Sequence, residues 1–239
     1  MDTPDSLTAT LPKPTAARPL LGLTVLVVED SRFACEAVRL MCLRSGARIR
    51  RADSMRSARR HLQVYRPSVI IVDLGLPDGN GAELIAELAA AQPQVQAVLA
   101  MSADDHLEPD ARAAGARGFL AKPLKSVSAF QEEVLRVLPP ERRPSGPRLM
   151  TDEVVLPDRI AFLDDLAHIA DILESPPADS ELDYVAQFMA GIARLAGDEA
   201  LEDAAFELSK SRALGESTRS QTAAIVGLIQ ERLAMKMAI

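Results

Sequence analysis

The sequence is short of aromatic residues and cysteine: among 239 residues it has no Trp, two Tyr and two Cys. Since aromatic residues make up 3% and hydrophobic residues 48%, Ala, Leu and Val must fill the core, which favours a helix-rich protein. The cysteines, Cys35 and Cys42, lie about two turns apart on one predicted helix, too far for a disulfide. We therefore expect two buried thiols that act as small hydrophobic residues.

Long apolar runs and a targeting segment are also absent. The apolar runs are far shorter than the roughly 20 residues of a membrane-spanning helix, so no membrane partner is expected. Residues 1–19 are polar and carry four prolines, unlike the charged-then-apolar start of a secretory signal peptide. We expect a flexible leader over residues 1–20 and a cytoplasmic location.

Positive charge is scarce in the second half of the chain. Residues 150–239 carry 7 Lys and Arg against 17 Asp and Glu, a net charge of −10. Contacts with nucleic-acid phosphates need cations, so we expect no DNA-binding function for this half.

Over residues 21–139, apolar segments alternate with amphipathic ones. Strands are predicted near residues 23–28, 47–52, 69–72, 94–101 and 117–121, and each precedes a predicted helix. This alternation predicts an α/β domain with a doubly wound, five-stranded parallel sheet of the flavodoxin-like kind.

A proline-rich stretch then divides the chain. Residues 139–147, PPERRPSGP, contain four prolines and a glycine, and a linker is expected over residues 140–150. No strand is predicted beyond it. Amphipathic helices near residues 158–174, 179–196, 198–214 and 217–237 predict a smaller all-α bundle over residues 151–239.

Polar residues stand at the predicted strand ends: Glu29 and Asp30, Asp73, Ser102, and Lys122. Taken alone, Asp73 is better explained as a strand-terminating residue that caps the next helix. Together these ends meet at one sheet edge, where α/β proteins bind ligands. Three convergent carboxylates repel one another unless a hard dication lies between them, and Mg²⁺ suits their oxygens.

The same set of side chains suggests phosphoryl transfer. Asp73 would be the nucleophile that accepts the phosphoryl group as an acyl phosphate. Lys122 would neutralise charge on the transferring group, and the Ser102 hydroxyl would bond a phosphoryl oxygen afterwards.

Residues 22–139 resemble the CheY-like receiver domain of bacterial two-component response regulators. The match includes Pro77 and Gly81 after Asp73, Ala103 after Ser102, and Pro123 after Lys122. The resemblance implies phosphorylation of Asp73 by a histidine kinase or phosphotransferase, in a domain that catalyses its own phosphoryl transfer and dephosphorylation. It also implies a cis Lys122–Pro123 bond, a metal ligand in the Gly75 carbonyl, and a switch residue in Phe119.

Arginine is concentrated in one stretch. Between Arg39 and Arg66 there are nine arginines and a single acid, Asp53. This stretch is either a docking face for an acidic partner, including the chain's own C-terminal half, or a solvated surface.

In the helical half, residues 187–208 are similar to a histidine-phosphotransfer (HPt) domain. The matching positions are Gly191, Gly197, Leu201, Ala205 and Leu208. Gln187 stands at the position of the phosphoacceptor His, and Ala190 at that of a Lys. The resemblance implies a pseudo-HPt module that binds receivers or kinases without relaying phosphate.

Other interpretations of this half stay open. Asp183 and Gln187 lie one helical turn apart, a spacing similar to helical phosphatases of phosphorylated receivers, in which an amide positions the attacking water. His168 is a rival phosphoacceptor, although no Lys-Gly follows it. A plain bundle that forms a homodimer would also explain the amphipathic pattern.

Overall fold

The structure is a computed structural model that describes residues 12–92, 94–147, 153–175 and 177–236. The first part of the expected leader, the end of the expected linker and the last residue of the predicted final helix lie outside these residues. None of the helices described has the length and apolar character that crossing a bilayer requires.

A parallel sheet forms the centre of the α/β unit (residues 12–147). Its strands are arranged in the order β2 (Arg48–Ala52), β1 (Thr24–Val28), β3 (Val69–Asp73), β6 (Ala97–Ser102) and β7 (Gly118–Ala121). All neighbouring pairs are parallel. The chain order reverses between β1 and β3, which is the flavodoxin-like arrangement and confirms the predicted fold.

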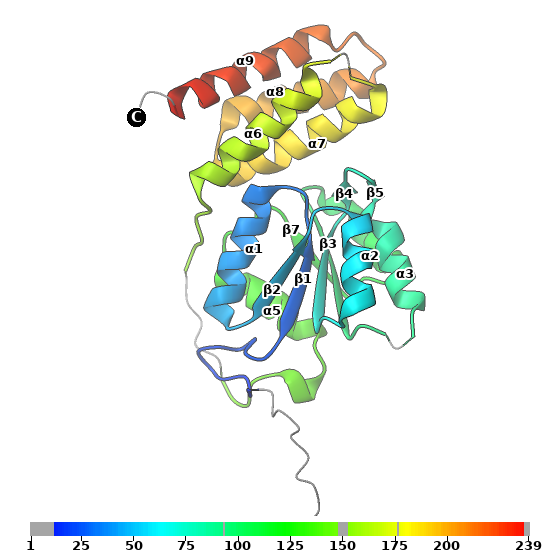
Figure 1. Ribbon diagram of the computed structural model, residues 1–239, viewed down its shortest axis with the longest axis vertical. Helices are drawn as coiled ribbons and strands as arrows, with labels where there is room; N and C mark the ends of the chain where they lie inside the picture. Colours follow the sequence, from blue (N-terminus) through cyan, green and yellow to red (C-terminus); the bar gives the residue numbers. More distant parts are fainter. Residues whose placement is uncertain (1–11, 93, 148–152, 176, 237–239) are drawn as a thin grey trace, which may run out of the picture.

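Helices cover both faces of this sheet (Figure 1). On one face lie α1 (Arg32–Ser45) and α5 (Val127–Val137). On the other lie α2 (Met55–Val64), α3 (Gly81–Ala90) and α4 (Glu108–Ala114). The central strand β3 is buried throughout because it contributes Val69 and Ile71 to one core and Ile70 and Val72 to the other. This double burial explains the uninterrupted apolar run that precedes Asp73.

Short elements that the sequence did not predict follow β3, β6 and α5. Strands β4 (Gly75–Leu76) and β5 (Gly79–Asn80) form a small hairpin, and the Asn80 side chain caps α3 by accepting a bond from Ala82 N at 2.9 Å. A 3₁₀ turn, η1 (Asp105–Leu107), precedes α4, and a second, η2 (Pro140–Arg142), follows α5.

The helical unit (residues 159–236) contains α6 (Arg159–Leu173), α7 (Asp179–Ala196), α8 (Glu199–Ala213) and α9 (Arg219–Lys236). These bounds agree closely with the predicted helices. Asp158 and Asp198 cap α6 and α8, and Gly197 takes the left-handed conformation, with φ of 73°, that allows the tight α7–α8 turn.

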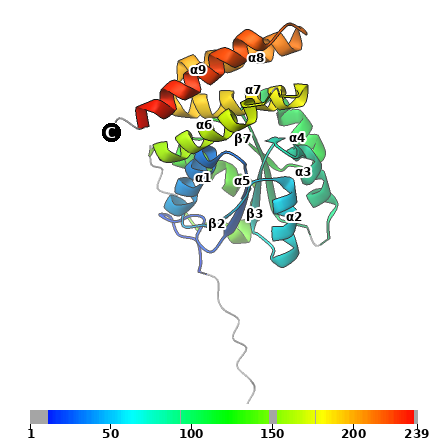
Figure 2. The same cartoon turned by 45° about the horizontal axis from the view of Figure 1, so that its top comes forward.

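The helical unit packs directly onto the α/β unit, over the carboxyl ends of the strands and beside α1 (Figures 1 and 2). One hydrophobic cluster runs without a break from α1 and α5 into α6 and α7. At this boundary the rings of Phe33 and Phe162 lie 5.3 Å apart. The two units therefore share a core, although the proline-rich linker indicated two separate ones.

The segment before α6 is also attached to the α/β unit. Val154 forms an isolated antiparallel bridge with Ser126, supported by a bond from Val155 N to Lys125 O at 2.9 Å. Apart from this isolated bridge, the described residues beyond the linker form no strand, as predicted.

Candidate functional site

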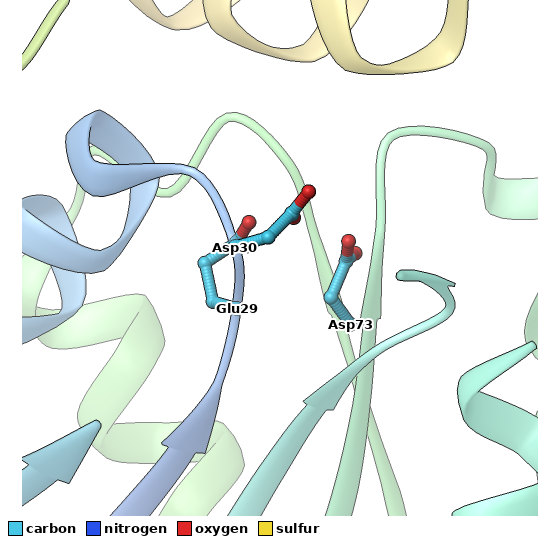
Figure 3. A group of neighbouring side chains, drawn as sticks. All are labelled: Glu29, Asp30 and Asp73. Atoms are coloured by element: carbon cyan, nitrogen blue, oxygen red, sulfur yellow. The ribbon is translucent and has the colours of Figure 1, made fainter. Parts of the chain in front are cut away.

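Three carboxylates meet at the carboxyl edge of the sheet. Asp73 is the last residue of β3, and Glu29 and Asp30 directly follow β1. Because β1 and β3 are paired with Val28 opposite Val72, the residues after them lie side by side. One oxygen from each carboxylate lies within 4.8 Å of the other two. Figure 3 shows Asp30 and Asp73 projecting beyond the strands toward the helical unit.

Lys122 joins this cluster from β7, two strands away from β3. Its Nζ lies 2.7 Å from Glu29 Oε2 and 2.9 Å from Asp73 Oδ1. The Lys122–Pro123 peptide bond is cis, as the resemblance implied. The structure therefore brings together the acids and the lysine that the sequence placed at separate strand ends.

Burial shapes the protonation of this cluster. It raises the pKa of Glu29 to about 7, although the Lys122 charge opposes the shift. It likewise raises the pKa values of Asp30 and Asp73 to about 6 each. Burial alone would lower the pKa of Lys122, but the charges of Asp73 and Glu29 raise it above its usual value. Lys122 therefore stays protonated, and its single positive charge is shared among the three carboxylates.

The remaining negative charge fits a divalent cation. Asp30 Oδ1 is buried and has no hydrogen-bond partner among the described residues. Gly75, the expected carbonyl ligand, lines the same cavity as the three acids. Carboxylate and carbonyl oxygens around an uncompensated charge are the donors that Mg²⁺ prefers, so these residues fit it.

Ser102 and Phe119 lie close to this edge without lining that cavity. Ser102 ends β6, is fully buried, and its Oγ accepts a bond from Asp104 N at 3.1 Å. Phe119 lies half-buried on β7 and packs against the core beneath α3 and α4.

The helical unit adds residues to the site that the sequence did not identify. The Tyr184 hydroxyl of α7 donates a hydrogen bond to Asp30 Oδ2 at 2.5 Å. Burial and the nearby Asp30 charge raise the pKa of this hydroxyl, so it remains a donor. No local motif marked Tyr184, since its role depends on a contact across 154 positions of the chain.

Gln187, by contrast, was predicted and lies over the same edge. Its amide packs so closely on Gly75 that a Cβ there would come within 2.5 Å of Gln187 Nε2. Asp183 lines the same groove as Gln187, but both its oxygens accept bonds from Arg212, at 2.8 and 3.1 Å. The carboxylate of the proposed Asp183–Gln187 pair is therefore held in an ion pair with α8.

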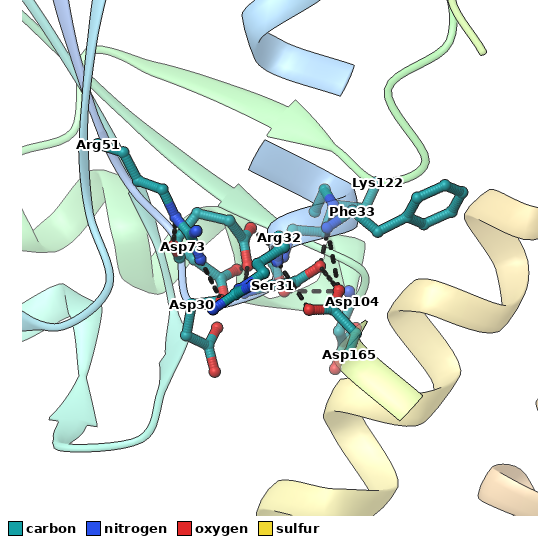
Figure 4. Close-up of polar contacts among 12 residues, drawn as sticks. Asp30, Ser31, Arg32, Phe33, Arg51, Asp73, Asp104, Lys122 and Asp165 are labelled. Carbon is teal, nitrogen blue, oxygen red and sulfur yellow. Dashed lines mark hydrogen bonds and ion pairs between the residues drawn. The ribbon is translucent and has the colours of Figure 1, made fainter. Parts of the chain in front are cut away.

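Asp165 of α6 is a second residue that the sequence missed. Its carboxylate accepts bonds from Ser31 Oγ at 2.7 Å, Arg32 N at 2.9 Å and Phe33 N at 3.0 Å (Figure 4). It thus caps the N-terminus of α1 from the other unit, although Ser31 already caps the same helix at Ala34 N. The excess of acids in this half was the only signal in the sequence.

Two other candidates lie away from the site. His168 is exposed on α6, and its ring lies 6.3 Å from that of Phe188. In the arginine-rich stretch, Arg39 and Arg59 pair with Glu36 and Glu87 of the α/β unit. A third arginine of the stretch, Arg44, pairs with Glu153 of the C-terminal half, so the stretch contacts that half at this point.

Comparisons with known proteins find similarity over part of the chain. The chain is 32% identical over 99 residues to the KDP operon transcriptional regulatory protein KdpE of Escherichia coli, covering 41% of this chain and 44% of KdpE. It is 35% identical over 77 residues to the DNA-binding transcriptional activator DevR/DosR of Mycobacterium tuberculosis, covering 32% of this chain and 36% of that protein. The chain thus spans less than half the length of these two relatives.

Among solved structures, the chain is similar to the chemotaxis response regulator CheY4 of Vibrio cholerae. The two are 27% identical with a TM-score of 0.45, over 48% of this chain and 98% of CheY4. The family "Response regulator receiver domain" matches residues 25–132. This range contains the sheet, the three acids and Lys122. Residues 25–132 are therefore a response regulator receiver domain.

Proposed function

We propose that this chain is a response regulator that is phosphorylated on Asp73 by a histidine kinase or phosphotransferase, and that its helical unit acts by protein contact. The observation that carries the proposal is the grouping of Asp73, Lys122, Glu29 and Asp30 at one sheet edge. No other His, Cys, Asp or Glu cluster of this kind occurs among the described residues.

The chemistry follows from these side chains. An ionised oxygen of Asp73 attacks the phosphorus of a phosphohistidine, and the P–N bond breaks. Its electron pair returns to the imidazole nitrogen, which takes a proton from water. Lys122, held 2.9 Å from Asp73 Oδ1, neutralises charge that develops on the phosphoryl oxygens.

Glu29, Asp30, Asp73 and the Gly75 carbonyl would hold Mg²⁺, which supplies further charge neutralisation for the phosphoryl group when it is bound. After transfer, Ser102 would release Asp104 N and bond a phosphoryl oxygen. Phe119 would then move inward, because it lies on the strand beside Ser102. These two residues would convert phosphorylation into a change of shape.

The proposed role of the helical unit is that of a pseudo-HPt module. Its support is the position of Gln187, which α7 places over the acceptor edge, where a phosphohistidine would have to lie. A glutamine amide forms no phosphoryl bond. The unit therefore binds a receiver surface without passing phosphate on.

A second candidate is a phosphatase that acts on the receiver of a partner protein through Gln187. The amide at an acceptor edge favours it, whereas the Asp183–Arg212 ion pair does not. If it is correct, Gln187→Ala should slow dephosphorylation of a partner receiver. Gln230→Ala, an exposed amide on α9, is the control, and equal decay in all proteins would rule this candidate out.

DNA binding is not part of the proposal, although KdpE and DevR/DosR are named as transcriptional regulators. Residues 150–239 carry a net charge of −10, which disfavours contacts with phosphates. A mobility-shift assay with genomic fragments should show no salt-dependent duplex binding, and such binding would refute this part.

Phosphoramidate with Mg²⁺ tests the central claim. Wild type should gain the mass of one phosphoryl group, and Asp73→Asn should not. Asp53→Asn, at an exposed acid, should be modified like wild type. Equal labelling of wild type and Asp73→Asn would exclude Asp73 as the acceptor.

A further inference from the structure

We propose that the helical unit is a lid on the chain's own phosphorylation site: it excludes donor and metal when closed, and phosphorylation holds it open. This inference rests on the proposed acceptor, Asp73. It assigns functions to Tyr184, Gln187 and Asp165, which belong to the helical unit and not to the receiver domain.

The first observation is the size of the space above Asp73. Asp73 is only 5% exposed, and it faces a cavity of about 30 Å³ between the two units. The helical unit lines this cavity with Gln187, Phe188, Gly191, Ile192 and Leu195. Such a volume holds about two water molecules. A phosphoryl group with its donor and a partly hydrated Mg²⁺ needs far more room, so transfer requires the lid to move.

The second observation is that the lid takes up groups needed by the metal. Tyr184 donates to Asp30 Oδ2, leaving only Oδ1 of that carboxylate without a partner. Gln187 meanwhile packs against Gly75, whose carbonyl is the expected fourth ligand. Closure and metal binding therefore compete for the same side of the site.

The third observation is that polar contacts hold the lid at its edges. The buried Asp165 caps α1 by accepting three hydrogen bonds. The donors lie in residues 31–33, which directly follow the proposed metal ligands Glu29 and Asp30 in the sequence. Arg32 pairs with Asp164 at 2.8 Å, and Arg194 donates to Ala103 O at 3.1 Å on the far side of the cavity. These contacts are directional, so a modest shift of the helical unit breaks them together.

Donor binding and phosphorylation are thermodynamically linked to the opening of the lid. A donor that binds only the open form has its apparent affinity reduced by the fraction of open protein. Conversely, a phosphoryl group on Asp73 occupies the space of the closed lid and shifts the population toward the open form. Opening exposes the α7 face of Phe188, Ile192 and Leu195, which is the surface available to a partner.

The test compares full-length wild type with Asp165→Ala, which removes the cap on α1, and Tyr184→Phe, which removes a single hydroxyl. With phosphoramidate and Mg²⁺, Asp165→Ala should be phosphorylated about tenfold faster than wild type. Calorimetric titration with Mg²⁺ alone should show a several-fold tighter affinity for Tyr184→Phe, because Asp30 Oδ2 is then free. Asp171→Ala, which changes an exposed acid on the same helix as Asp165, should match wild type in both measurements.

Hydrogen exchange gives a third readout. Amides of α7 should exchange faster in phosphorylated wild type than in unphosphorylated protein, and Asp165→Ala should exchange faster without phosphorylation. If the phosphorylation rate, the Mg²⁺ affinity and the hydrogen exchange are the same in both variants as in wild type, the lid proposal is overturned. Asp73 would still be the acceptor in that case. If no variant is labelled at Asp73, the proposed function itself fails. Thermal melting of each variant shows that it is folded.

Discussion

Tyr184 of the helical unit donates a hydrogen bond of 2.5 Å to Asp30 of the receiver domain. Through this contact, a helix far along the chain reaches one of the two acids that lie beside the proposed phosphoacceptor, Asp73. The proposed phosphorylation site is thus lined by two parts of the chain.

Stability should depend on pH in the absence of metal. Burial raises the pKa values of Glu29, Asp30 and Asp73 to about 7, 6 and 6, above their usual values. Between about pH 4 and 7 the folded protein then binds more protons than the unfolded chain, so the unfolding free energy decreases as pH rises. We expect a loss of a few kcal/mol from pH 5 to pH 8, since one pKa unit is worth about 1.4 kcal/mol.

Urea unfolding in EDTA at both pH values measures this change. Mg²⁺ at pH 8 should restore much of the lost stability, and Glu29→Gln should show a weaker pH dependence. A free energy of unfolding that increases from pH 5 to pH 8 would contradict the assignment of these shifts.

Removal of the buried lysine should destabilise the fold strongly. Lys122→Ala leaves Glu29 and Asp73 buried without their counter-charge, and the loss of one partner from a buried ion pair costs about 3–5 kcal/mol. The loss should be smaller at pH 5, where the acids are protonated. Lys210→Ala, at an exposed pair with Glu207, should change the free energy of unfolding by less than about 1 kcal/mol. Equal effects of the two variants would contradict the cluster.

A methyl group at Gly81 should distort the acceptor strand. A Cβ there would lie 2.0 Å from the Asp73 carbonyl oxygen, and this backbone atom has no rotamer by which to move aside. We expect Gly81→Ala to lower the unfolding free energy by about 3 kcal/mol. Gly227→Ala in α9 meets no atom within 4 Å and should stabilise the protein by up to about 1 kcal/mol. Denaturant melts measure both, and a harmless Gly81→Ala would refute the close approach.

Both cysteines should resist thiol reagents in the folded protein. Cys35 and Cys42 are free and buried, and burial raises the pKa of each thiol to about 12. At pH 8 a colorimetric disulfide reagent should therefore react slowly with native protein and rapidly with two thiols per chain in denaturant. Fast reaction of either thiol in the native state would show that the buried face of α1 is more accessible to solvent than the structure indicates.

The residues at the strand ends could be predicted because each depends on a local pattern. The run from Val69 to Val72 marks a buried strand, and parallel strands place their carboxyl ends at one edge. Glu29, Asp30, Asp73 and Lys122 follow from those two facts, and the structure brings them within contact distance. The helices were likewise predictable from their amphipathic spacing and their Asp caps.

The helical unit's place on the molecule could not be predicted in this way. Gln187 was singled out from a motif, but nothing in the sequence indicated that it would face Gly75 of its own chain. Tyr184 and Asp165 carry no motif at all. Their partners lie more than a hundred positions earlier and are selected by the packing of α6 and α7 on α1.

The sequence by itself thus determined the receiver fold and the chemistry around Asp73, because apolar periodicity and strand-end positions act over short stretches of chain. Only the tertiary structure decided that α7 covers Asp73 and that Tyr184 reaches Asp30. That choice depends on the shape complementarity of two surfaces and on a shared core around Phe33 and Phe162, which no local pattern encodes.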